Sequence, residues 1–136
     1  MTFVVSPLIA AIVLLLVRAL LTVAFAREGI LKLKDIRAFA KNDGVPVPLA
    51  LVVAIAELAA ALSFATGVLA QWAGLGVILL MLITTGMQVF RWHSKYWAQK
   101  GGPEYDLLLL TLSAVIAVFG PGAIAIPTLI DLLFGR

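Results

Sequence analysis

The feature that most constrains this chain is a series of four long apolar runs, each about as long as a bilayer is thick. The runs cover residues 7–26, 47–70, 73–90 and 104–122, and shorter polar segments separate them. A helix needs about 20 predominantly apolar residues to cross the hydrocarbon core. A helix also satisfies its own backbone hydrogen bonds, as lipid-exposed backbone must. The runs therefore predict an all-α integral membrane four-helix bundle.

Composition supports a single transmembrane domain over residues 1–136. Hydrophobic residues make up 63% of the chain and charged residues only 12%, whereas a soluble domain has about 25% charged residues. Four spans of about 20 residues leave too few residues for a separate catalytic domain. The apolar stretch from Val4 to Ala26 is longer than the core of a signal peptide and has no basic residues before it, so we expect it to be retained as the first span.

Two of the segments outside the spans show helical patterns. Residues 27–42 place apolar side chains on one face and charged side chains on the other, which predicts an amphipathic helix lying in the membrane interface. Asp43 and Gly44 then predict a turn. Gly120, Pro121 and Gly122 interrupt the fourth run, and the tail at 127–134 is compatible with a short amphipathic helix.

Basic residues are distributed unevenly among the segments between spans. Residues 27–45 contain five lysines or arginines and residues 91–103 contain three, whereas Arg136 is the only one at the termini. The short turn between the second and third spans has none. Because basic loops stay in the cytoplasm, we expect both basic loops inside and both termini outside a plasma membrane.

Several kinds of chemistry lack their usual residues. The chain has no cysteine and one histidine, which excludes disulfides, cysteine-ligated zinc and iron–sulfur clusters. No phosphate-binding loop, nucleophile elbow or metal-ligand spacing is found. The net charge of +3 gives no reason to expect a nucleic-acid partner. We therefore expect no covalent cofactor, no metal and no self-sufficient enzyme.

Arg18 and Glu57 are the charges placed deepest in the predicted spans. Counted from Ala26 and Val47, the cytoplasmic ends of two antiparallel spans, both lie roughly 12–15 Å deep. A charge at this depth is costly and usually pairs inside the bundle. The sequence thus predicts an Arg18–Glu57 ion pair. The pair either fixes the two helices in register or forms a polar pocket for the head of a lipid-soluble ligand or a proton relay.

Gln88 and His93 lie near the cytoplasmic end of the third span. His93 follows Arg91 and Trp92, and in that position it is able to donate a hydrogen bond to a quinone carbonyl or a lipid phosphate. A solvated histidine among interfacial aromatic residues is the simpler interpretation, and belt composition favours it. Both residues are included in the candidate polar pocket.

Several short motifs resemble those of the DoxX family of small membrane proteins. The spacing Arg18-x6-Phe25-x3-Gly29-x2-Lys32 is similar to the opening signature of that family, and Glu57 and Gly67 follow in the second span. Later matches are GGPEYDLLLL at 101–110 and GPG at 120–122. The order and spacing of these motifs from Arg18 to Gly122 resemble the family more closely than any one motif does.

The resemblance implies a four-helix bundle of the bacterial or archaeal plasma membrane. The family takes its name from a subunit of a thiosulfate:quinone oxidoreductase, and other members are linked to redox homeostasis. By analogy, Arg18, Glu57 and Glu104 would line or support a polar site. The chain departs from the family in having Ala125-Ile126-Pro127 where members often have a Ser-Leu-Asp-like tail, and in lacking the cysteines that some relatives use.

Three functions therefore remain as hypotheses. The first is a membrane subunit of a quinone-linked oxidoreductase, with quinone as a non-covalent cofactor, membrane lipids around it and a protein partner. The second is a structural accessory subunit of a larger membrane assembly, without ligand chemistry. The third is a small transporter, which ranks last because the sharp break at Gly120 lies near a membrane face rather than at its centre.

Overall fold

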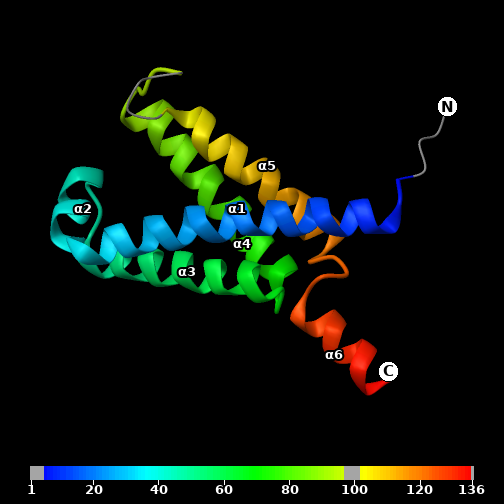
Figure 1. Ribbon diagram of the computed structural model, residues 1–136. Helices are drawn as coiled ribbons and strands as arrows, with labels where there is room; N and C mark the ends of the chain where they lie inside the picture. Colours follow the sequence, from blue (N-terminus) through cyan, green and yellow to red (C-terminus); the bar gives the residue numbers. More distant parts are fainter. Residues whose placement is uncertain (1–4, 97–101, 136) are drawn as a thin grey trace.

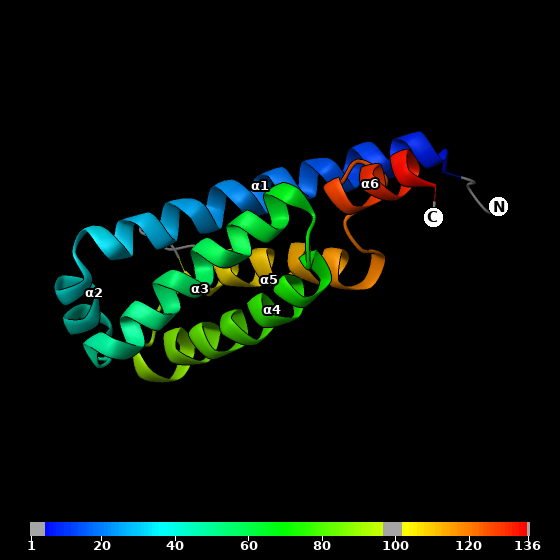
Figure 2. The same cartoon turned by 90° about the horizontal axis from the view of Figure 1, so that it is seen from below.

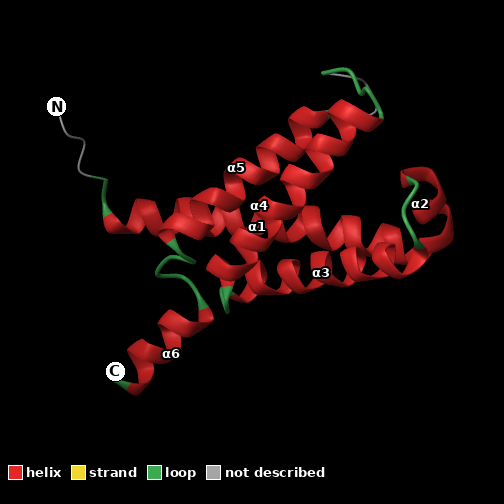
Figure 3. Cartoon of the chain, turned by 180° about the vertical axis from the view of Figure 1, so that it is seen from behind, coloured by secondary structure: helices red, strands yellow, loops and turns green. Residues whose placement is uncertain are grey.

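The computed structural model describes residues 5–96 and 102–135, and in these ranges all regular structure is helical (Figure 3). Val4, Lys100, Gly101 and Arg136, which entered the sequence analysis, lie outside the described residues. The elements in chain order are α1 (Pro7–Lys34), α2 (Ile36–Asp43), α3 (Val47–Thr66), α4 (Ala70–Gly86), the π-helical turn η1 (Met87–Arg91), α5 (Pro103–Phe119) and α6 (Ile126–Phe134).

Local sequence explains where these helices begin and end. Proline stands in the first turn of α1, α3, α5 and α6, where its missing N–H has no partner to lose. Gly44 and Gly67 end α2 and α3 with φ of +66° and +82°. Only glycine adopts this left-handed conformation without steric cost. The turns predicted after Asp43 and at Gly120 are therefore confirmed.

The bundle consists of two antiparallel helix pairs that cross each other. Figures 1 and 2 show α1 running along α3 in one pair and α4 running along α5 in the other. Each pair has a glycine at its closest approach: Gly29 lies against Leu58 and the carbonyl of Ala54, and Gly74 lies against the carbonyl of Ser113. Contacts between the two pairs are sparser, so the space between them is where cavities occur.

The core lies where the two pairs cross. Phe25 and Phe64 are fully buried with ring centroids 6.2 Å apart, and Leu21 and Ile116 are fully buried beside them. Outside this core the helices expose many large apolar side chains. In water such a surface would aggregate, whereas lipid covers it without cost.

The all-helical fold predicted from the sequence is confirmed. Among the described residues, three helical segments are long and apolar enough to cross a membrane, namely Pro7–Lys34, Val47–Thr66 and Ala70–Arg91. Helix α5 has 17 residues and is about 25 Å long at 1.5 Å per residue. It is shorter than each of these three segments and packs along α4, completing a bundle of four long helices.

The first helix is longer than the first span predicted from the sequence. Helix α1 does not end near Ala26 but continues to Lys34, and the chain turns only at Asp35. The predicted interfacial helix over 27–42 is therefore divided: its first half extends α1, and its second half is α2. The Asp35 side chain accepts a hydrogen bond from the Ala38 N–H and so caps α2.

Candidate functional site

A polar cavity of about 370 Å³ lies between the two helix pairs. Because Phe39 and Asp43 of α2 line it, it lies at the end of the bundle that carries α2. Residues from every helix except α6 line it. Its polar and charged lining consists of Glu28, Lys32, Asp43, Glu57, Thr84, Gln88, Trp92, Ser94, Tyr105 and Asp106, and its apolar lining includes Phe25, Phe39, Val53, Met81 and Leu109.

Lys32 and Glu57 form an ion pair on one wall of this cavity. Lys32 Nζ donates to Glu57 Oε1 at 2.5 Å, and the two side chains are only 13% and 3% exposed. Glu28, one turn earlier in α1, lies 3.9 Å from the same Nζ. The Phe39 ring of α2 lies under the ammonium at 5.2 Å, within the range of a cation–π contact. Lys32 is thus oriented by three elements.

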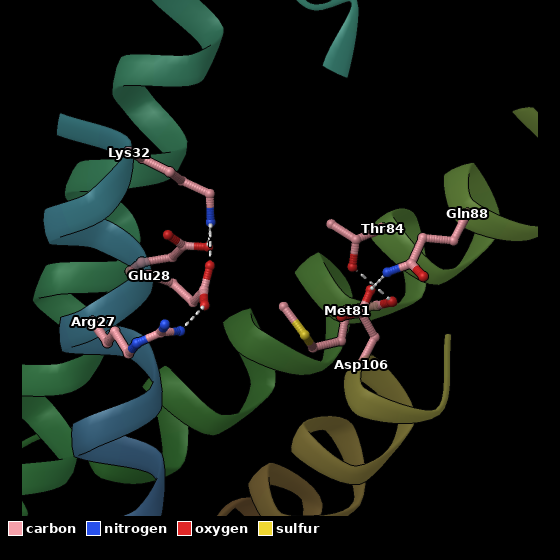
Figure 4. Close-up of polar contacts among 8 residues, drawn as sticks. Arg27, Glu28, Lys32, Met81, Thr84, Gln88 and Asp106 are labelled. Atoms are coloured by element: carbon pink, nitrogen blue, oxygen red, sulfur yellow. Dashed lines mark hydrogen bonds and ion pairs between the residues drawn. The ribbon is translucent and has the colours of Figure 1, made fainter. Parts of the chain in front are cut away.

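Asp106 and Gln88 form a second polar contact on the opposite wall. Gln88 Nε2 donates to Asp106 Oδ2 at 2.8 Å, and Asp106 is buried in the first turn of α5. Gln88 belongs to the π-helical turn that ends the α4 segment, and such turns often reposition side chains at functional sites. Figure 4 shows the α1 group and the group from α4, η1 and α5 on opposite sides of a gap.

The cavity contains more acidic than basic groups. Four carboxyl groups (Glu28, Asp43, Glu57 and Asp106) line it, together with one ammonium group, that of Lys32. Burial raises the pKa of Asp43 above its usual range, and the positive charge of Lys32 partly opposes this rise. The arrangement therefore favours a ligand head that donates hydrogen bonds to carboxylates while accepting one from an amine.

One buried oxygen of the cavity has no hydrogen-bond partner among the described residues. Glu57 Oε2 is buried and accepts no hydrogen bond, although Oε1 of the same carboxylate is paired with Lys32. A buried polar atom without a partner costs about 1–3 kcal/mol. A ligand hydroxyl or a bound water would remove that cost, so the oxygen is a candidate contact for a ligand.

Arg18 lies in a different part of the molecule and pairs with no carboxylate among the described residues. Its buried guanidinium donates to four backbone carbonyl oxygens: Phe64 O at 2.7 Å, Ala65 O at 2.9 Å, Pro121 O at 3.1 Å and Ile124 O at 2.5 Å. The first two belong to the last turn of α3, where carbonyls lack helical partners. Arg18 therefore joins α1, the end of α3 and the segment before α6.

The predicted Arg18–Glu57 ion pair is wrong, and the length of α1 explains why. The matched depths assumed a first span that ends at Ala26, but α1 continues to Lys34. The extension of about two helical turns shifts α1 along α3 by roughly 12 Å. As a result Lys32, not Arg18, meets Glu57, and Arg18 reaches the far end of α3.

The structure brings only two of the five candidate residues into the cavity. Glu57 and Gln88 line it. His93 is exposed, has φ of +48° and does not line it. Glu104 Oε1 accepts a hydrogen bond from the Gly102 N–H at the start of α5, and Arg18 binds carbonyls elsewhere.

Sequence reasoning did not assign Lys32, Glu28 or Asp106 to the site. Lys32 was counted among the basic residues between the first two spans, although it occurs in the motif that resembles DoxX proteins, and Asp106 was not singled out within the motif at 101–110. No group of three or more histidine, aspartate or glutamate residues in the described ranges is arranged to hold a metal ion.

Comparison with known families gives one match, to a model described as DoxX, over residues 13–93. The matched range is more than half of the chain and includes Glu28, Lys32, Glu57 and Gln88, whereas Asp106 lies beyond it. No curated protein and no solved structure matches at a significant level.

Proposed function

This chain belongs to the DoxX family, and from this premise we propose that it is a membrane subunit that binds the head of a quinone for a redox complex. The observation that carries the proposal is the Lys32–Glu57 pair, which forms one wall of a polar cavity inside an otherwise apolar bundle. Charged residues inside a membrane bundle usually mark a ligand or proton pathway, because burying them is costly.

The cavity offers the donors and acceptors that a quinone head requires. A quinone carbonyl accepts hydrogen bonds, and Lys32, Gln88 and Tyr105 carry donors in the cavity lining. The reduced form presents hydroxyl donors instead, for which Glu57 Oε2 is an acceptor without a partner among the described residues. Phe25 and Phe39 supply apolar surface for the ring.

The chain's own residues would hold and orient the ligand, while the quinone supplies the redox chemistry when it is bound. Reduction of a bound quinone needs an electron donor, and we assign that role to a protein partner. A protein partner in the membrane is therefore part of the proposal.

The test measures the affinity of the purified protein, in lipid nanodiscs, for the tailless quinone 2,3-dimethoxy-5-methyl-1,4-benzoquinone. Glu57→Gln keeps the size of the side chain but removes the charge that orients Lys32. We expect this variant and Lys32→Met to lose roughly tenfold or more in affinity, because a hydrogen bond to a charged group contributes about 1.5–3 kcal/mol.

Lys34→Met is the matched control, since Lys34 lies in the same helix but is exposed and does not line the cavity. It should bind as the wild type does. The double variant Lys32→Met/Glu57→Gln avoids an unpaired buried charge, so a loss of affinity there reflects the ligand contact rather than misfolding. Wild-type affinity in Lys32→Met, Glu57→Gln and the double variant would contradict the proposal.

A further inference from the structure

A second cavity, almost entirely apolar, lies between α3 and α4 and meets the polar cavity at Glu57. This groove has a volume of about 470 Å³. Small residues and larger apolar residues line it together, among them Ala56, Ala59, Gly76, Trp72, Leu79 and Ile83. Glu57 and Val53 line both cavities. The two spaces therefore adjoin across one buried carboxylate.

We propose that the α3–α4 groove holds the apolar tail of the same ligand whose head occupies the polar cavity, so that the ligand enters sideways from the lipid. This inference rests on the proposed function and adds the route and the tail site to it. The ligand is accordingly an amphiphile with a compact polar head and a long hydrocarbon chain.

The chemistry of the two cavities supports one amphiphilic occupant. Glu57 is the one charged residue in the lining of the groove, whereas the polar cavity carries four carboxyl groups and a lysine. The rim of the groove is exposed on the lipid-facing surface, with Val52 and Leu79 each 62% exposed. A tail in this groove never has to leave an apolar environment, while the head reaches the groups that bind it.

This geometry also explains how a polar head reaches a site inside the bundle. Contacts between α3 and α4 are sparser than those within either helix pair. The groove therefore forms between the pairs, at the place where small residues leave space. Transfer to apolar surroundings brings a tail little hydrophobic gain when it comes from lipid, so the groove acts by shape: it gives the tail a place beside the bound head, and a side chain that fills it excludes the tail.

Gly76 allows the groove to be closed without disturbing the fold. A Cβ added to Gly76 would meet nothing within 4 Å, and the residue lines the groove but not the polar cavity. Gly86, near the end of the same helix, also has open space beside it and lines neither cavity. Gly76→Phe and Gly86→Phe are thus a matched pair, and Gly76→Leu provides a smaller obstruction.

The experiment compares the tailless quinone used above with its decyl-tailed counterpart, in nanodiscs at equal mole fraction in the lipid. We expect Gly76→Phe to weaken binding of the tailed ligand by roughly tenfold or more, because the phenyl ring and the tail cannot occupy one space. Gly76→Leu should have an intermediate effect. Binding of the tailless quinone should remain unchanged, and Gly86→Phe should bind both ligands normally.

The possible results separate this inference from the proposed function. If the wild type binds neither quinone, the proposed function fails and the tail site fails with it. If the wild type binds both and Gly76→Phe also binds both with wild-type affinity, only the tail site is overturned. If native mass spectrometry shows a wild-type dimer that Gly76→Phe converts to a monomer, a second copy of the chain occupies the groove, and the inference is again overturned.

Discussion

At the scale of single residues, the two charges that the sequence placed deepest in the spans are both buried, but they are neutralised in different ways. Glu57 is paired with a lysine, whereas Arg18 is surrounded by backbone carbonyls. The end of a helix carries a partial negative charge and unpaired carbonyls, so the end of α3 supplies both the charge and the acceptors that a buried guanidinium needs. Arg18 therefore has the geometry of a structural clamp, whereas Glu57 keeps one buried oxygen, Oε2, without a hydrogen-bond partner among the described residues.

Replacing Arg18 should destabilise the fold without altering the polar cavity. Arg18→Met leaves four carbonyl oxygens without their donor, and we expect a loss of about 3–5 kcal/mol, typical of removing one partner from a buried charged network. Arg18→Lys should lose less, because an ammonium still donates to some of the carbonyls. Thermal unfolding in detergent measures both variants.

The exposed Arg37 of α2 provides the control for this comparison. Arg37→Met should unfold at the wild-type temperature, because no buried acceptor depends on it. Arg18→Lys, once folded, should bind the tailless quinone as the wild type does. Equal stability of Arg18→Met and the wild type would contradict the clamp.

At the scale of the helices, two glycines fix how closely the members of each pair pack. Gly29 allows α1 to approach α3, and Gly74 allows α4 to approach α5. In lipid the association of helices depends on such close packing rather than on hydrophobic burial. The same helix α4 carries Gly76 on a face with open space, so it offers both a packed and an unpacked glycine.

Alanine at these two positions of α4 should therefore have opposite effects. In Gly74→Ala the new Cβ would lie 2.9 Å from the Ser113 carbonyl oxygen and 3.2 Å from Ala117, and overpacking of this kind costs about 1–3 kcal/mol. Gly76→Ala meets nothing and should be neutral or stabilise by about 0.5–1 kcal/mol, because glycine weakens a helix. Thermal unfolding of the two variants in the same detergent decides; a stabilised Gly74→Ala would refute the packing role.

The same scale shows what the sequence could and could not predict. The ends of α2, α3 and α5 follow from local signals at Gly44, Gly67 and Gly120 and were placed correctly or within a few residues. The end of α1 has no such signal. The charges after Ala26 were therefore interpreted as marking the membrane surface and the end of the first span. The helix instead continues through them, and the Lys32 side chain, which is 13% exposed, pairs with Glu57.

The prediction of which residues form the site depended on where α1 ends. Each residue added to the end of α1 shifts the helix by about 1.5 Å along α3 and rotates its side chains by about 100°. An error of two turns in the end of α1 therefore changes which residue is expected to pair with Glu57. Gln88 was identified from its position, but Asp106 was not, because the contact between them joins residues that are far apart in the sequence. Tertiary packing alone brings the two walls of the cavity together.

At the scale of the whole molecule, the two ends of the bundle differ in chemistry. One end carries α2, the polar cavity and most of the basic residues. At this end Arg91 connects η1 to the end of α2 by donating to the Gly44 carbonyl at 3.2 Å. The other end carries the Arg18 clamp, the start of α1 and helix α6 (Figures 1 and 2). Both basic segments of the sequence thus lie at the same end.

This asymmetry leads to a prediction about orientation. Lys32 is neutralised by Glu57 and contributes little to the bias, but Arg27, Lys34, Arg37 and Lys41 remain at this end of the bundle. We expect the end with the polar cavity to face the cytoplasm and α6 to face outward, because segments rich in lysine and arginine are retained inside. Because the natural chain has no cysteine, a single introduced cysteine reports its side unambiguously.

Asn42→Cys in α2 and Asp131→Cys in α6 are the two positions to compare, since both residues are exposed and neither substitution removes a basic residue. A membrane-impermeant maleimide applied to intact bacterial cells should label Asp131→Cys at once and Asn42→Cys only after permeabilisation. The reverse pattern would place the cavity outside and would require the partner of this subunit to be sought there. The expected pattern places the end that carries the polar cavity on the cytoplasmic side, so the protein partner of the proposed function should contact this subunit at that end.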